Sequence, residues 1–317
     1  MPIDERWDIF DILFLFPAVN RLNPVPPPFH SAYDAQGGRK RGVHILEGKL
    51  YLCLRDGIAE VSAESMRMSL TPFSGAEVLC AGREFLFASD DRGAIWRLDR
   101  RSMLERGMSC GGPGICDLCL SPDGMRLFAL LGEGDSVLLS DAHSGRPLAL
   151  NCCGCNPQNL SFCGKTLAAS GGKSSCVLLY SADALQCVAE IPMPGPVCSA
   201  LLCRHALFAL CLTPEWNTLL VLRRREKQNI IHLSGMPGCL CLHNNLLLAA
   251  TQGRLYTFCA DSGRLLGVCC APGRASRLFA AGDKLFLLDP LSECAFVSGS
   301  AGAWKTICCG VRHMCII

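Results

Sequence analysis

Cysteine is the residue type in this chain with the greatest capacity for chemistry. The 317 residues include 23 cysteines, and a thiolate is both a nucleophile and a ligand for soft metal ions. The densest group is Cys152, Cys153 and Cys155, which surround Gly154 in a predicted turn. Three thiols in one turn could clamp a soft ion if a fourth ligand approached. No metal or other cofactor is otherwise predicted, and this group is the metal-site candidate to test.

The remaining cysteines favour packing over chemistry. Cys116 and Cys119 have the two-residue gap of a zinc knuckle but lie in a predicted strand, where positions three apart face opposite sides. In a short secreted chain, so many cysteines would predict disulfides, but this chain is long and its cysteine count is odd. Free thiols in a reducing cytoplasm are the better interpretation, with cysteine packing as a small apolar residue. A thiol-rich metal-binding or redox-sensing protein stays open as an alternative function.

Two further motifs occur in predicted hairpins rather than beside the structural elements that their function requires. Residues 171–174 (Gly-Gly-Lys-Ser) contain part of a P-loop but fall between predicted strands rather than before a helix. Arg223, Arg224, Arg225 and Lys227 form the densest basic run, which predicts a solvated hairpin between two strands, with an acidic partner as the alternative. The net charge is only +2, and the 7% of aromatic residues do not interleave with basic ones. Nucleic-acid binding is therefore not expected.

The elements that must position these side chains follow from an internal repeat. Seven segments share one order of four apolar strands separated by short polar, Gly- or Asp-containing turns, and the fourth strand ends in Gly or Pro. The second strand aligns the segments, at residues 49–51, 84–87, 126–129, 166–169, 206–209, 246–249 and 284–287. Boundaries between segments fall near residues 75, 114, 157, 196, 238 and 275.

This repeat predicts an all-β fold, a seven-bladed β-propeller of four-stranded antiparallel blades, over residues 43–317. These 275 residues (317 less the first 42) divided by seven give about 39 per segment, close to the roughly 40 to 45 residues of a propeller blade. A single blade cannot bury both of its apolar faces, so each must stack on its neighbours. Strands such as Leu219–Leu222 are apolar at successive positions, as expected when both faces are covered.

The two ends of the chain depart from the repeat. Residues 1–42 form a predicted N-terminal extension with a Pro-rich linker, and the stretch from Trp7 to Phe16 is apolar enough to pack on the propeller or on a partner. The segment Val311–Ile317 is an extra strand, which we expect to complete the first blade and latch the ring. Acidic residues stand where a signal peptide carries positive charge, and the run Ile12–Phe16 is far shorter than a membrane span. A cytoplasmic protein without a membrane span is therefore expected.

Two repeats resemble a known family. The third contains Ser121–Gly124 (Ser-Pro-Asp-Gly) and Asp141–Leu148 (Asp-Ala-His-Ser-Gly-Arg-Pro-Leu), and the sixth contains Asp261–Arg264 (Asp-Ser-Gly-Arg). These blades are similar to those of the YncE-like, lactonase-like bacterial seven-bladed propellers. That group includes binding proteins, lactone hydrolases and subunits of quinone-dependent dehydrogenases, so the resemblance implies the fold and leaves the activity open. The Gly-His and Trp-Asp pairs of WD-repeat proteins are absent from the repeats.

Residues on the predicted inner strands are those that can reach the mouth of the central channel. The candidate binding residues there are His44, Glu77, Asp117, Asn159, Ser199 and Arg277. A lactonase-like site needs a cluster of carboxylate, His or Asn side chains that binds a metal or transfers protons, and this set contains two carboxylates. We therefore predict no catalytic residues and a non-enzymatic scaffold that binds a protein or peptide partner through its loop face. A lactonase-like hydrolase with its site at the channel mouth is the alternative.

Overall fold

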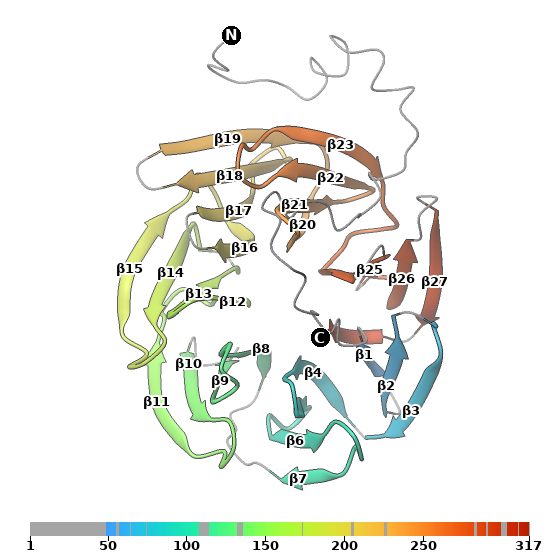
Figure 1. Cartoon of the computed structure of the whole chain (residues 1–317). Helices are drawn as coiled ribbons and strands as arrows, with labels where there is room; N and C mark the ends of the chain where they lie inside the picture. Colours follow the sequence, from blue (N-terminus) through green and yellow to red (C-terminus); the bar gives the residue numbers. More distant parts are fainter. Residues whose placement is uncertain are drawn as a thin grey trace, which may run out of the picture.

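The computed structural model describes residues 49–316, apart from residues 55–56, 64, 74, 108–113, 132–135, 173, 204–205, 225–226, 282–283, 290, 299–302 and 310. The described residues form seven four-stranded antiparallel sheets arranged as a ring (Figure 1). This arrangement confirms the predicted seven-bladed β-propeller. Within the described part of the chain, no helix is long and apolar enough to cross a membrane.

Each blade contains four strands, which lie side by side from the innermost to the outermost position. Blade 1 consists of β28 (Val311–Ile316), β1 (Lys49–Leu54), β2 (Gly57–Ser62) and β3 (Met68–Pro72). Blade 2 consists of β4 (Ala76–Ala81), β5 (Phe85–Asp90), β6 (Ile95–Asp99) and β7 (Glu105–Gly107), and blade 3 of β8 (Ile115–Leu120), β9 (Arg126–Leu131), β10 (Ser136–Asp141) and β11 (Pro147–Cys152). Blade 4 consists of β12 (Asn159–Cys163), β13 (Thr166–Ser170), β14 (Cys176–Ser181) and β15 (Cys187–Pro192). Blade 5 consists of β16 (Val197–Cys203), β17 (Ala206–Leu212), β18 (Thr218–Arg224) and β19 (Lys227–Leu233). Blade 6 consists of β20 (Pro237–His243), β21 (Leu246–Thr251), β22 (Arg254–Cys259) and β23 (Leu265–Cys270), and blade 7 of β24 (Arg277–Ala281), β25 (Lys284–Asp289), β26 (Cys294–Ser298) and β27 (Trp304–Cys309).

The last strand closes the ring. β28 pairs antiparallel with β1, from Leu50 opposite Ile316 to Leu54 opposite Val311. The expectation that this extra strand completes the first blade is therefore confirmed. β28 thus occupies the innermost position of blade 1. His44 and the rest of the N-terminal extension lie outside the described residues.

Apolar side chains between neighbouring blades hold the ring together. Seven hydrophobic clusters of described residues each join two adjacent blades. On β1, Leu50 and Leu52 pack toward blade 7, whereas Tyr51 and Cys53 pack toward blade 2, and all four are fully buried. Side chains that alternate along one strand thus pack against both neighbouring blades. This double contact explains why the second strands are apolar at successive positions.

The turns between third and fourth strands show why glycine recurs in the repeat. In blades 3 and 6 this turn ends at Gly145 and Gly263, which both have a positive φ. The backbone N–H of each glycine donates to the carbonyl oxygen of the residue four positions earlier. Met66, Met103 and Leu185 take the equivalent left-handed position in blades 1, 2 and 4. Glycine adopts this conformation without a Cβ clash, so the fold accepts other residues there at some cost in stability.

At Gly238, β20 closely approaches both the connection that leads to blade 7 and β21 of its own blade. Gly238→Ala is expected to lower the free energy of unfolding by about 1–3 kcal/mol, the usual range for overpacking. A Cβ at this position would lie 2.5 Å from the carbonyl oxygen of Ala275 and 2.8 Å from that of Ala250, so the backbone would have to shift. The matched control is Gly267→Ala on β23, where a Cβ meets nothing within 4 Å. Urea unfolding checks the difference, and equal midpoints for the two variants would contradict this close approach.

Candidate functional site on the loop face

The two ends of the ring carry different loops. Because all blades share one antiparallel order, their inner strands run in the same direction and their second strands run back. The connections between blades and the hairpins between second and third strands therefore lie together at the end where the inner strands begin. We call this end the loop face, and the other end the opposite face.

Four predicted site residues occupy equivalent positions near the loop-face end of their inner strands. Asp117, Asn159, Ser199 and Arg277 pair with the fifth residue of the neighbouring second strand, namely Leu130, Ser170, Leu210 and Leu288. Glu77 lies beside this level, at a bulge in β4. The structure therefore places these five predicted residues on inner strands, at one end of the channel.

An ion pair crosses the channel at this level. Arg277 Nη2 of blade 7 lies 2.7 Å from Asp117 Oδ1 of blade 3, and these blades are separated by three blades on one side and two on the other. The Asp117 side chain is 3% exposed and that of Arg277 is 23% exposed. The second carboxylate oxygen of Asp117 accepts the backbone N–H of Leu160 in blade 4 at 2.7 Å. Asp117 is therefore held by two other blades.

Other polar residues at the same level also join blades. The Asn159 side-chain amide donates to the carbonyl oxygen of Cys198 in blade 5 at 3.0 Å. The Ser199 hydroxyl accepts the backbone N–H of Leu240 in blade 6 at 3.2 Å. Together with Asp117, these side chains satisfy backbone groups of the next inner strand, which a buried strand edge requires. Their observed contacts are structural.

Buried thiols lie near the ion pair. Burial, with a smaller contribution from the nearby charge of Asp117, raises the pKa of Cys80 to about 12. Burial also raises the pKa of Cys119 well above its usual value, with smaller contributions from Cys80 and Asp117. These thiols stay protonated at neutral pH, and a protonated thiol is a poor nucleophile.

The orientation predicted for Cys116 and Cys119 is wrong. Both side chains pack against the hydrophobic cluster between blades 3 and 4. The reason is a β-bulge between Ile115 and Asp117, which inserts Cys116 as an extra residue and shifts the alternation of side chains by one position.

The cysteines of the predicted metal-site candidate have separate neighbours. Cys152 ends β11 and is exposed, with its sulfur 3.6 Å from the Ser136 hydroxyl. Cys153 accepts a hydrogen bond from the Tyr180 hydroxyl at 3.1 Å, and Cys155 contacts Cys176 of β14. Among the described residues, no group of three or more His, Cys, Asp or Glu side chains could hold a metal ion.

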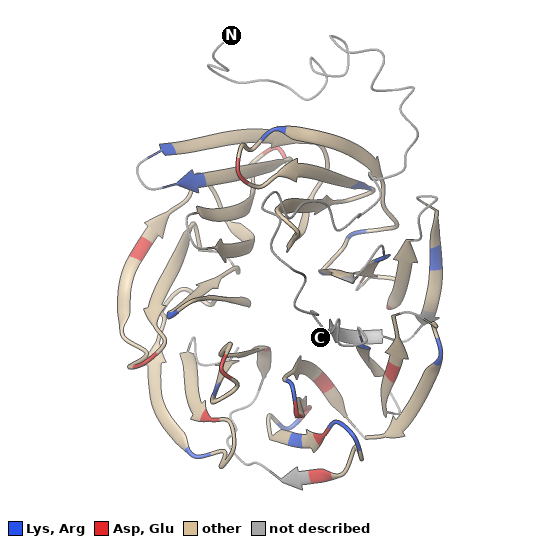
Figure 2. Ribbon diagram, in the orientation of Figure 1, with Lys and Arg blue, Asp and Glu red and all other residues tan. Residues whose placement is uncertain are grey.

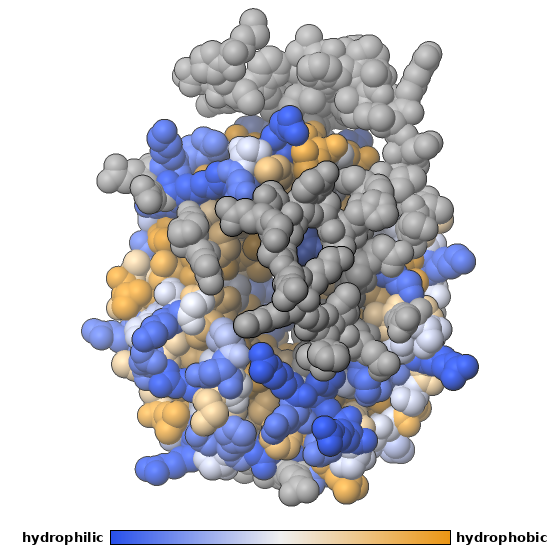
Figure 3. All heavy atoms as spheres, viewed as in Figure 1, coloured by the Kyte–Doolittle hydropathy of each residue, from blue (hydrophilic) through white to orange (hydrophobic). Residues whose placement is uncertain are grey.

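The two motifs without suitable context lie in hairpins, as predicted. Gly171, Gly172 and Ser174 lie between β13 and β14, and the basic run spans the end of β18 and the start of β19, with Arg224 opposite Lys227. Lys173 and Arg225 lie outside the described residues. Arg224 donates from its guanidinium to the carbonyl oxygen of Ala260 in blade 6. Figure 2 shows charged residues of both signs spread over several blades, and Figure 3 shows hydrophilic and hydrophobic side chains interspersed on the viewed face.

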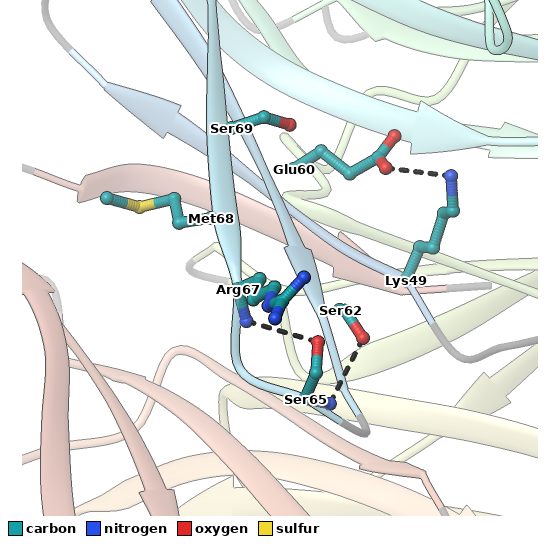
Figure 4. Close-up of a pocket in the computed structure, with 7 residues that line it drawn as sticks. All are labelled: Lys49, Glu60, Ser62, Ser65, Arg67, Met68 and Ser69. Atoms are coloured by element: carbon teal, nitrogen blue, oxygen red, sulfur yellow. Dashed lines mark hydrogen bonds and ion pairs between the residues drawn. The ribbon is translucent and has the colours of Figure 1, made fainter.

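Hollows in the described surface lie away from the channel. A groove of about 420 Å³ follows the outer part of blade 1 and is lined by Lys49, Glu60, Arg67, Met68 and nearby serines (Figure 4). Lys49 Nζ and Glu60 Oε1 are 2.7 Å apart within it. A second hollow of about 310 Å³ lies between blades 4 and 5, on the opposite face.

Trp216, the most distinctive side chain of the loop face, is not among the residues predicted from the sequence. It lies in the hairpin between β17 and β18, is 63% exposed and has φ of 63°. Its backbone N–H bonds the carbonyl oxygen of Thr213, as that of Gly93 bonds Asp90 in the equivalent hairpin of blade 2. Trp216 therefore takes a left-handed position that glycine occupies in another blade. Aligning these hairpins in the repeat would have revealed the substitution.

The structure resembles solved structures at low sequence identity. It matches Kluyveromyces lactis Hsv2 with a TM-score of 0.55 and 10% identity, over 71% of this chain and 74% of that chain. It matches a chain of the mitotic checkpoint complex with a TM-score of 0.60 and 12% identity, over 75% and 82% of the two chains. It matches the computationally designed Ika8 protein with a TM-score of 0.57 and 11% identity, over 81% and 83%.

These similarities define the class of protein, a seven-bladed β-propeller, and at such identities they establish the fold alone. No protein-family model matches the sequence, and no curated protein matches it.

Proposed function

We propose that this propeller is a non-enzymatic scaffold that binds a protein or peptide partner on its loop face, with Trp216 as a central contact. The observation that carries the proposal is a large apolar side chain exposed at a hairpin tip, in a backbone conformation that disfavours it. A left-handed conformation costs an L-residue with a Cβ roughly 1–2 kcal/mol. Strained residues of this kind cluster at functional sites, and Trp is enriched among the residues that dominate binding energy.

A second exposed apolar residue supports the same face. Leu291 is 79% exposed in the hairpin between β25 and β26 of blade 7. Its backbone N–H bonds the Asp289 carboxylate at 3.1 Å, which holds the hairpin in place. Rigid blades that present apolar residues on loops are suited to recognising a partner.

The YncE-like relationship and a cytoplasmic location form part of the proposal. The Asp141 carboxylate accepts the backbone N–H groups of His143 and Ser144, so the motif shared with that family serves to build a turn. Support for a reducing compartment comes from cysteines that pack as small apolar residues, since Cys53, Cys211 and Cys239 are buried in the hydrophobic clusters between blades. A lactonase-like hydrolase has less support, because Asp117, Asn159 and Ser199 already hold neighbouring blades.

Trp216→Gly is expected to abolish partner binding while leaving the free energy of unfolding unchanged or raising it by about 1 kcal/mol. Glycine removes the Cβ from the left-handed position and also removes the apolar contact surface. The measurement is affinity capture from an extract of the native host, compared between wild type and variant, with urea unfolding of both proteins.

The matched control is Met125→Ala, which truncates a 48% exposed apolar side chain in a hairpin of the opposite face. Proteins captured by wild type and by Met125→Ala, but not by Trp216→Gly, support the proposal. Capture that is equal for all three proteins would refute a role for the loop face.

A further inference from the structure

Thiols from two segments meet beside the connection between blades 3 and 4. Cys153 and Cys155 lie in this connection, and Cys176 begins β14. All three pack in the same hydrophobic cluster. The cluster therefore brings together cysteines that are about 20 positions apart in the chain.

The contacts distinguish one pair among these thiols. The side chains of Cys155 and Cys176 pack at the same cluster and each influences the pKa of the other, whereas the sulfur of Cys153 accepts the Tyr180 hydroxyl at 3.1 Å. The Ser174 hydroxyl lies 2.9 Å from the sulfur of Cys176. Cys176 is 8% exposed and Cys155 is half-buried, so a small solute reaches Cys155 first.

The backbone segments that carry the two cysteines also touch. A Cβ at Gly172, in the hairpin before β14, would lie 2.1 Å from the carbonyl oxygen of Asn156. Glycine is required at this position because of both this approach and its φ of 72°. The hairpin and the connection are therefore held together independently of the sulfur atoms.

We propose that Cys155 and Cys176 form a redox-active pair, which a two-electron oxidant such as hydrogen peroxide converts into a disulfide between the blade connection and β14. The Cys155 thiolate attacks one peroxide oxygen, the O–O bond breaks, and the leaving hydroxide takes a proton to become water. The Cys176 thiolate then attacks the sulfenic sulfur of Cys155, and the S–O bond breaks to release a second water. The two thiols supply two electrons, which reduce one peroxide.

The reaction depends on pH because only the thiolate attacks. Burial, together with smaller contributions from Cys176 and Cys153, raises the pKa of Cys155 to about 12, and the Ser174 hydroxyl opposes this rise. Burial raises the pKa of Cys176, and the Glu190 carboxylate adds to this effect while Ser174 opposes it. Disulfide formation is therefore slow at neutral pH and accelerates about tenfold for each pH unit up to the region of that pKa.

The test is peroxide treatment of the purified full chain, followed by alkylation of free thiols and mass spectrometry after trypsin cleavage. Lys165 and Lys173 separate the two cysteines on cleavage, so their disulfide appears as a crosslinked pair of peptides. We expect this crosslink in wild type and in the control Cys152→Ser, and its loss in Cys155→Ser and Cys176→Ser. Oxidation of Cys155 to Cys152 or Cys153 instead, or a Cys155 that stays reduced while the exposed Cys187 is oxidised, would overturn the proposal.

Serine variants provide a second readout that leaves both cysteines in place. Ser174→Ala is expected to slow disulfide formation at least about twofold at fixed pH, because it removes the hydroxyl that stabilises the thiolate. Ser175→Ala is the matched control and should leave the rate unchanged. Equal rates for the two variants would remove Ser174 from the mechanism, and a rate that is independent of pH would contradict attack by these buried thiols.

Discussion

Truncation after Gly310, which removes β28, is expected to abolish cooperative folding or to lower the free energy of unfolding by on the order of 5 kcal/mol. Five residue pairs join β28 to β1, and a ladder hydrogen bond contributes about 1 kcal/mol each. The loss also uncovers β1, in which Leu50, Tyr51 and Leu52 are fully buried. An unpaired apolar edge promotes aggregation.

The measurement is thermal and urea unfolding together with size-exclusion chromatography. The control is removal of Ile317 alone, since that residue lies beyond β28. Addition of a synthetic peptide covering residues 303–317 should restore part of the lost stability, because the strand can pair with β1 without being covalently attached. A truncated chain that unfolds with the same midpoint as wild type would show that ring closure does not depend on β28.

Arg277→Met is expected to lower the free energy of unfolding by about 3 kcal/mol, because it leaves a buried carboxylate without its cation. The Asp117 side chain is only 3% exposed, and the methionine cannot replace the guanidinium 2.7 Å away. The double variant Asp117→Asn/Arg277→Met should recover at least about half of this loss, because the neutral amide can still accept the backbone N–H of Leu160 and needs no counter-charge. Urea unfolding of the wild type, both single variants and the double variant measures the coupling.

The exposed ion pair between Arg126 and Asp183 is the matched comparison. The Asp183 side chain is 59% exposed, so solvent screens the attraction. Asp183→Ala should change the unfolding midpoint little. A result in which Arg277→Met and Asp183→Ala have the same small effect would mean that the cross-channel pair does not hold the ring.

Much of the fold could be predicted from the sequence because the second strand of each blade has a recognisable apolar pattern. The second strand of each blade faces two neighbours and has an apolar middle, as Leu207, Phe208 and Ala209 in blade 5 illustrate. Such runs are visible without knowledge of what packs on them. The predicted boundary near residue 196 and the latch at the C-terminus follow from the same regularity, and β16 and β28 confirm them.

The details of the inner strands could not be predicted, because they depend on bulges and on contacts between distant residues. The bulge at Cys116 reverses the side-chain alternation inside β8, a strand that itself contains no Gly or Pro. Asp117 and Arg277 are 160 positions apart, and only the closed ring brings them together. Trp216 could not be predicted for a different reason. The feature that distinguishes it is a left-handed backbone conformation, which a tryptophan disfavours.

The pairing of β28 with β1 also has a consequence for synthesis of the chain on the ribosome. β1 begins at Lys49, and its inner partner ends at Ile316. At roughly 5–20 residues per second, the chain between them takes on the order of 10 to 50 seconds to make. During that interval one edge of β1 has no native partner, so a chaperone that shields a single strand edge would protect the nascent protein until β28 has been made.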